Sequence, residues 1–284
     1  GNHEGSNGSL TVTGSGTTVT TGGTDNTIQV GWAGTGTLNL QDGAQLSTLQ
    51  LEAGRHGDGT INIDGAGSFA VVSTQNGLFS GDDAPFAGFV RAGRTRGSDG
   101  EINLTNGGHM QISAGTSNNT DTYEPGLQIA RNPGSVGAVN IDGAGSRIQM
   151  IQSQPANGEF GIGGPSVQVG RGGYGSLTIT NGGHLDMDSG GGFLGVGQHY
   201  GGLGELTIAG SGSAIVMQGE DFGSTAVIGG EEFSRAIVNI DSGGVLQLVN
   251  GDTQLQIGNQ GVATVNVNGG TIANQGTNAF TGIG

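Results

Sequence analysis

The chain has 284 residues, a formal net charge of −15 at pH 7, no cysteine and 64 glycines. A protein this acidic is repelled by nucleic acid and by anionic membrane surfaces, so we expect no nucleic-acid partner. The glycines follow no Gly-X-Y period, which excludes collagen. No apolar run approaches the ~20 residues that a membrane-spanning helix needs.

A short phrase recurs nine times: an apolar residue, a small polar residue and a second apolar residue, followed by a glycine-containing turn. It stands at 10–12, 38–40, 61–63, 102–104, 139–141, 177–179, 206–208, 238–240 and 265–267. Successive phrases begin 23 to 41 residues apart. An internal period of this size is typical of a solenoid, in which each repeat covers the face of its neighbour.

Each repeat contains two further alternating segments. The second follows the glycine turn, as at 110–112, 148–150, 185–187 and 215–217, and the third is clearest at 28–30, 167–169 and 255–257. Alternation with a period of two places one set of side chains inside and the other outside. The pattern predicts an all-β fold: a right-handed, single-stranded parallel β-helix of about nine coils of three short strands, forming one domain over residues 1–284.

The segment 167–185, VQVGRGGYGSLTITNGGHL, contains a third strand, a corner, a first strand and the start of a second. It resembles the repeat of autotransporter (type V secretion) passenger domains, over essentially the full chain. The resemblance implies a fragment of a longer passenger, extracellular and displayed at the bacterial cell surface. Such passengers are normally preceded by a signal peptide and followed by a C-terminal membrane β-barrel, so contact with the membrane would come only through that barrel. The family includes adhesins, self-associating factors and some enzymes.

Three consecutive repeats have long insertions between their second and third strands, at 73–88, 113–126 and 152–166. Stacking is expected to bring these insertions to one corner of the solenoid, where such insertions commonly bind ligands. They contain Phe79, Phe86, Tyr123 and Phe160, together with Asp82, Asp83, Asp121, Glu124 and Glu159.

Four arginines occupy one position, just after the third strand, in four successive repeats: Arg55, Arg94, Arg131 and Arg171. At a coil spacing of about 4.8 Å, neighbouring exposed charges repel by roughly 1 kcal/mol in water. Acids such as Asp58, Asp99 or the loop carboxylates, or alternatively a ligand anion, are therefore expected between them. The outward residues of the third strands form a second polar column: Gln29, Glu52, Arg91, Gln128 and Gln168.

These columns and the insertions predict a polar trough that binds an extended glycan. Its residues would be Glu52, Arg55, Arg91, Arg94, Tyr123, Gln128, Arg131, Gln168 and Arg171. We therefore expect an adhesin that binds a host or bacterial surface glycan or protein, or that associates with further copies of itself.

Two alternatives remain open. One is a polysaccharide-degrading enzyme. A lyase needs a base beside a cation, which could be Arg91, Arg94 or Arg131. A hydrolase needs two carboxylates about 5–10 Å apart, and the candidates are Glu52, Asp82, Asp83, Glu124 and Glu159. The other is a purely structural stalk. Because no distinctive catalytic pair is legible, the sequence favours a binding protein over an enzyme and names no catalytic residue.

The outward column of the first strands is rich in Asn and Thr and predicts a ladder of hydrogen bonds between coils. Its members are Thr11, Asn39, Asn62, Asn103, Asn140, Thr178, Thr207, Asn239 and Asn266. His109 and His184 follow equivalent turns two repeats apart, about 10 Å, which is too far to share a metal ion. With no nucleotide-binding or zinc motif present, the sequence predicts neither a cofactor nor a resident metal.

Overall fold

The computed structural model describes residues 1–22, 26–73, 88–114, 125–152, 164–188, 191–219 and 223–284. This part of the chain contains 27 β-strands and no helix. The strands form three sheets of nine, and every pairing between strands is parallel. Each coil contributes one strand to each sheet, which confirms the predicted parallel β-helix with nine coils of three strands.

The first sheet holds the strands that carry the recurring phrase: β1 (Asn7–Thr13), β4 (Thr35–Gln41), β7 (Asp58–Asp64), β10 (Asp99–Thr105), β13 (Val136–Asp142), β16 (Tyr174–Thr180), β19 (Leu203–Ala209), β22 (Arg235–Asp241) and β25 (Val262–Asn268). The second sheet holds β2 (Thr18–Thr20), β5 (Gln45–Thr48), β8 (Phe69–Ser73), β11 (His109–Ala114), β14 (Arg147–Gln152), β17 (His184–Asp188), β20 (Ala214–Gln218), β23 (Val245–Val249) and β26 (Thr271–Gln275). The third sheet holds β3 (Thr27–Val30), β6 (Gln50–Ala53), β9 (Phe89–Ala92), β12 (Gly126–Ile129), β15 (Ser166–Val169), β18 (Phe193–Val196), β21 (Ser224–Ile228), β24 (Thr253–Ile257) and β27 (Phe280–Ile283).

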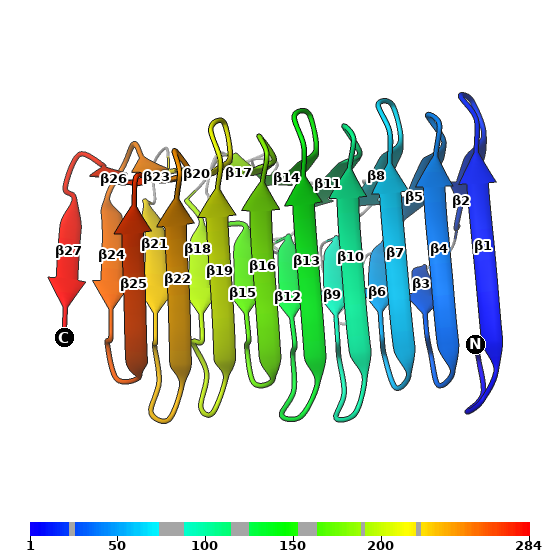
Figure 1. Cartoon of the computed structure of the whole chain (residues 1–284), viewed down its shortest axis with the longest axis horizontal. Coiled ribbons are helices and arrows are strands. Elements are labelled where there is room, and N and C mark those ends of the chain that lie inside the picture. The colour runs from blue at the N-terminus through cyan, green and yellow to red at the C-terminus, as the bar shows by residue number, and fades with distance from the viewer. Residues whose placement is uncertain (23–25, 74–87, 115–124, 153–163, 189–190, 220–222) are drawn as a thin grey trace, which may run out of the picture.

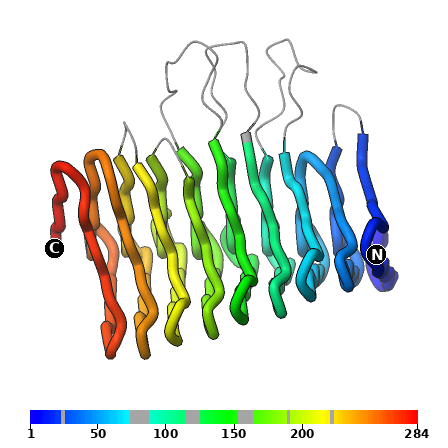
Figure 2. The backbone as a smooth tube through the Cα atoms, turned by 90° about the horizontal axis from the view of Figure 1, so that it is seen from above, coloured from blue at the N-terminus to red at the C-terminus, as the bar shows by residue number. Residues whose placement is uncertain are grey.

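The coil winds right-handed. In Figure 1 the first-sheet strands run upward in front, the third-sheet strands run downward behind them, and the chain advances from the N-terminus at the right to the C-terminus at the left. Seen from above in Figure 2, the coils stack side by side along one axis, with the two termini at opposite ends. Residues far apart in sequence therefore become neighbours wherever they hold equivalent places in successive coils.

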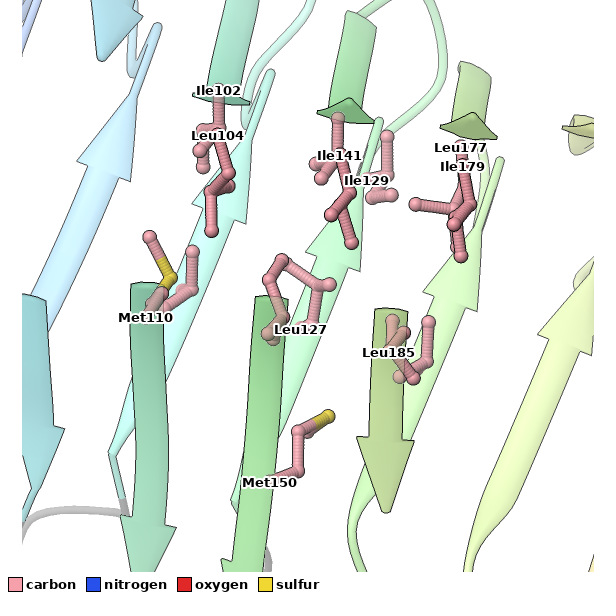
Figure 3. Close-up of a cluster of buried hydrophobic side chains, with 14 of the residues drawn as sticks. Ile102, Leu104, Met110, Leu127, Ile129, Ile141, Met150, Leu177, Ile179 and Leu185 are labelled. Carbon is pink, nitrogen blue, oxygen red and sulfur yellow. The ribbon is translucent and has the colours of Figure 1, made fainter. Parts of the chain in front are cut away.

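The interior is a set of continuous apolar stacks. One first-sheet stack runs in register through Leu40, Ile63, Leu104, Ile141, Ile179, Ile208 and Ile240, all fully buried. Figure 3 shows side chains of several coils, among them Leu104, Ile141 and Ile179, meeting inside the coil with Met110 and Leu127 of the other two sheets. The period-two alternation thus places apolar residues inside as predicted.

Glycine at the corner after the third strand permits close stacking. Gly170 has a positive φ of 64°, and a Cβ there would lie 2.0 Å from the carbonyl oxygen of Leu203 on the next coil. No larger side chain fits that approach without movement of the backbone. One coil earlier the corner is made by Ala130, which itself takes a φ of 54°, an uncommon conformation for a residue with a Cβ.

The Asn/Thr ladder of the first sheet is present. All nine residues pair in register, and amide-to-amide bonds run from Asn62 to Asn39 (2.8 Å), from Asn103 to Asn62 (3.0 Å) and from Asn140 to Asn103 (2.8 Å). Each amide donates to the coil before it, so the ladder stabilises the stacking of coils.

Asp142, at the end of β13, is expected to make stability depend on pH. Its Oδ1 accepts 2.6 Å hydrogen bonds from the Thr180 hydroxyl and the Asn181 amide of the next coil, and these bonds lower the pKa of its carboxyl below the usual 3.8. A carboxyl whose pKa is lowered on folding stabilises the fold above its unfolded-state pKa, and this contribution is lost as the pH falls through the folded-state pKa.

The variant Asp142→Asn should therefore be less stable than the parent at pH 7, and the difference should shrink below about pH 4. Urea unfolding at several pH values measures it. A deficit of the same size at pH 7 and pH 3 would contradict a role for the charge.

Candidate functional site

The outward residues of the third sheet form one polar column, as predicted. Gln29, Glu52, Arg91, Gln128 and Gln168 pair in register from β3 to β15. Their side chains are linked along the column: Gln29 Nε2 donates to Glu52 (3.2 Å), Arg91 Nε to Gln128 (3.5 Å), and Gln128 Nε2 to Gln168 (3.3 Å). We call these five residues the third-sheet column.

Glu52 is the centre of a buried ion-pair network. Its carboxylate lies 2.6 Å from Nη1 of Arg91, 2.9 Å from Nη1 of Arg94 and 3.9 Å from Nη1 of Arg55. Only 1% of Glu52 and 8% of Arg91 are exposed, and burial lowers the pKa of Arg91 against the opposing effect of Glu52. These two residues hold the coils together rather than offering a surface to a ligand.

The arginines after the third strand also stack in register. Backbone bonds run from Arg55 N to Gly31 O (3.1 Å), from Arg94 N to Gly54 O (2.9 Å) and from Arg131 N to Gly93 O (2.9 Å). With Arg171 on the next coil they form what we call the arginine column. The expected pairing with Asp58 or Asp99 is wrong: in the described part of the chain the acid that Arg55 and Arg94 contact is Glu52. Glu52 is three residues before Arg55 and lies on the strand beside the one that precedes Arg94.

Within the described residues, the arginine column divides into two arginines that contact the Glu52 carboxylate, Arg55 and Arg94, and two that contact no carboxylate. The latter two, Arg131 and Arg171, have no carboxylate partner among the described residues, and the Nε atom of each, like that of Arg55, is buried without a hydrogen bond. The pKa of Arg131 is lowered by burial, then by the neighbouring charges of Arg94 and Arg171. These two guanidiniums are therefore the places in the predicted site where an external anion would be most stabilised.

Acidic residues at the start of the next first-sheet strand accompany Arg55 and Arg94 but not Arg131 and Arg171. The first-sheet strands that come after Arg55 and Arg94 begin with Asp58 and Asp99, whereas those after Arg131 and Arg171 begin with Val136 and Tyr174. Burial, and then the Asp58 charge, raise the pKa of Asp99, as expected where acids gather. The corners that contain Arg131 and Arg171 therefore have the arginine but no acid at the first position of the strand that follows.

Part of the predicted site lies outside the described residues. Tyr123 is one such residue, and so are the aromatic and acidic residues assigned to the three insertions. The described residues on either side of the insertions are in register between coils. Before the insertions, Ser73 pairs with Ser113 near the ends of β8 and β11. After them, Gly126 pairs with both Phe89 and Ser166 at the starts of the third-sheet strands.

Exposed aromatic residues lie at the corner between the third and first sheets, which the sequence reasoning missed. Tyr200 and Phe233 are on adjacent coils, with ring centroids 5.2 Å apart. Farther toward the N-terminus, the guanidinium of Arg55 lies 4.3 Å from the ring centroid of Trp32. The missed signal was Phe233, which stands where equivalent turns have glycine.

No metal site is found in the described part of the chain. It contains no group of three or more His, Cys, Asp or Glu that could hold an ion. His109 and His184 are separated by Arg147 in the second sheet, which confirms their predicted separation. The described residues also include no helix long and apolar enough to cross a membrane.

The fold and these columns define a parallel β-helix solenoid with a cationic corner. No protein family and no curated protein matches the sequence. One solved structure is similar to this chain, the crystal structure of a TibC-catalysed hyper-glycosylated TibA fragment. The two share 15% identity over 98% of this chain and 100% of that chain, with a TM-score of 0.13. A likeness this distant carries no argument about function, and the fold stands on the strand pairing alone.

Proposed function

We propose that this β-helix is an extracellular adhesive domain of a bacterial surface protein. It would act by binding a surface ligand or another copy of itself. The observation that carries the proposal is repetition: the same polar side chains recur in register on successive coils, in the first-sheet ladder and in the arginine column. A regular surface of this kind supports many weak, equivalent contacts, whose sum gives useful affinity.

Catalysis is less well supported. Of the carboxylates considered for a hydrolase, Glu52 is the one within the described residues, and it is buried in contact with three arginines. A carboxylate so paired is poorly placed to act as a nucleophile or to exchange a proton with a substrate. A purely structural stalk would not require Arg131 and Arg171, which contact no carboxylate in the described part of the chain and each hold a buried Nε atom without a hydrogen bond.

The ligand surface that we propose is the C-terminal half of the predicted trough. Gln128 and Gln168 supply amides, and Arg131 and Arg171 supply guanidiniums, which bind carboxylates or sulfates through paired hydrogen bonds. This arrangement favours a glycan as the ligand. Glu52, Arg55, Arg91 and Arg94 would support that surface from beside it.

Self-association is expected to be measurable. Sedimentation velocity should reveal a dimer whose population rises with concentration, and cells that display the domain should settle together. Because the chain is acidic, added acids on a contact face should repel, so Thr178→Glu with Thr207→Glu in the first-sheet ladder should reduce both effects.

The control places the same charges on the second sheet, with Thr18→Glu and Thr271→Glu, and should leave association unchanged. A strict monomer at high concentration, together with cells that do not clump, would remove self-association from the proposal.

A further inference from the structure

Phe233 occupies a corner position that is glycine in the other corners of the same type. Five turns that lead into first-sheet strands close with a bond from the fourth residue's N–H to the first residue's carbonyl, at Ser6, Ser98, Ser135, Gly202 and Ser234. The third residue of each has a positive φ, and in four of them it is glycine: Gly5 (74°), Gly97 (81°), Gly134 (77°) and Gly201 (72°). In the fifth it is Phe233, with a φ of 61°.

A bulky residue with a positive φ is strained, and Phe233 is not buried in the core, so core packing does not offset this strain. Phe233 is 71% exposed, and Tyr200, whose ring it meets edge-on, is 64% exposed. Glu231 fixes the corner that presents Tyr200, since its carboxylate accepts from the Tyr200 N–H (2.9 Å) and lies 3.0 Å from His199 Nδ1. An aromatic pair held in place, exposed and strained is typical of a binding surface.

The aromatic pair lies at the same corner as the arginine column, in the two coils that follow it. The positions equivalent to the arginines in these coils are Gln198 and Gly230, and Tyr200 and Phe233 stand two and three residues after them. Arg131, Arg171, Tyr200 and Phe233 lie on four successive coils at the same corner of the solenoid. Three coil steps advance about 14 Å along the solenoid axis, so a ligand that reaches from the arginines to the aromatic rings needs more than one sugar ring. The cations lie at one end of these four coils and the aromatic rings lie at the other.

Charge makes the two ends different. Between the ends, the carboxylate of Glu205 is occupied by the Tyr174 hydroxyl (2.9 Å). At the aromatic end, Glu231 and Glu232 precede Phe233, with Arg235 just after it. A single anionic group is therefore favoured beside Arg131 and Arg171, and uncharged rings are favoured beside Tyr200 and Phe233.

We infer that this corner binds a short acidic glycan, with a terminal carboxylate or sulfate held by Arg131 and Arg171 and an uncharged sugar ring packed on Tyr200 and Phe233. The inference rests on the proposed adhesive function and specifies its ligand class. Guanidinium groups bind planar carboxylates and sulfates through paired N–H donors, and the C–H face of a pyranose packs on an aromatic ring as other apolar surfaces do.

The test uses the whole chain and three probes: sialyllactose for the carboxylate, sulfated lactose for the sulfate, and lactose as the neutral reference. Ligand-observed NMR titration gives each Kd. We expect one acidic probe or both to bind more tightly than lactose, and whichever binds identifies the anion. The double variant Arg131→Gln, Arg171→Gln should raise that Kd about ten- to a hundredfold.

Phe233→Gly is the sharpest variant for the aromatic end. It restores the residue that equivalent turns use, so thermal stability should be unchanged or higher while the Kd rises about three- to tenfold. Arg147→Gln is the matched charge control, because Arg147 lies on the second sheet and pairs with Asp186. It should leave the Kd unchanged.

Three results would overturn the inference, and they separate it from the proposed function. If lactose binds as tightly as the acidic probes and the arginine variants change nothing, the anion site is wrong. If no probe binds but cells still clump, adhesion stands and the glycan site falls. If Phe233→Gly abolishes dimer formation while leaving saccharide binding intact, the aromatic pair is a contact between copies.

Discussion

Replacing Glu52 with glutamine is expected to lower the free energy of unfolding by about 3–5 kcal/mol, the range found when one partner of a buried ion pair is removed. The carboxylate contacts Arg91 at 2.6 Å and Arg94 at 2.9 Å. The amide leaves the 8%-exposed Arg91 charged and uncompensated. Urea unfolding measures the loss.

Glu232→Gln is the matched control, because Glu232 is exposed on a corner of the same solenoid. It should change stability by no more than about 0.5 kcal/mol. A Glu52→Gln variant as stable as this control would mean that the network contributes nothing net. The arginines would then have to be satisfied in another way.

Replacing Ile179 with aspartate is expected to cost several kcal/mol and to disrupt the central coils. Ile179 is fully buried and stacks between Ile141 and Ile208, so a carboxylate there has no partner and no water. Each coil of a solenoid depends on its neighbours. The damage should therefore spread to adjacent coils and appear as increased hydrogen exchange in β13, β16 and β19.

Thr178→Asp, on the same strand but facing outward beside Asn140 and Thr207, is the control and should have a much smaller effect. If the two variants unfold at the same urea concentration, the inward and outward assignment of this strand is incorrect. Such a result would contradict the register of the whole first sheet, because a shift by one residue exchanges the two faces.

The sequence was sufficient for the fold because the information is local and repeated. The alternation in each phrase, such as 177–179, indicates which side chains point inward. Because the phrase recurs nine times, only one way of stacking the repeats keeps all the apolar side chains inside. The same logic placed the Asn/Thr ladder, the third-sheet column and the arginine column in register, since equivalent positions in successive coils must be neighbours. Period-two alternation therefore determined the core, the register and which residues lie on the outer faces.

Only the tertiary structure decided how the outward residues share their charges. Glu52 precedes Arg91 and Arg94 by about 40 residues, and nothing local distinguishes it from Asp58 or Asp99 as their partner. The aromatic residues were missed for a related reason: composition shows that Tyr200 and Phe233 exist, but their adjacency depends on the stacking of two corners. Side-chain pairing and exposure depend on the distances between side chains of neighbouring coils, and these distances are known only once the coils are stacked in the folded structure.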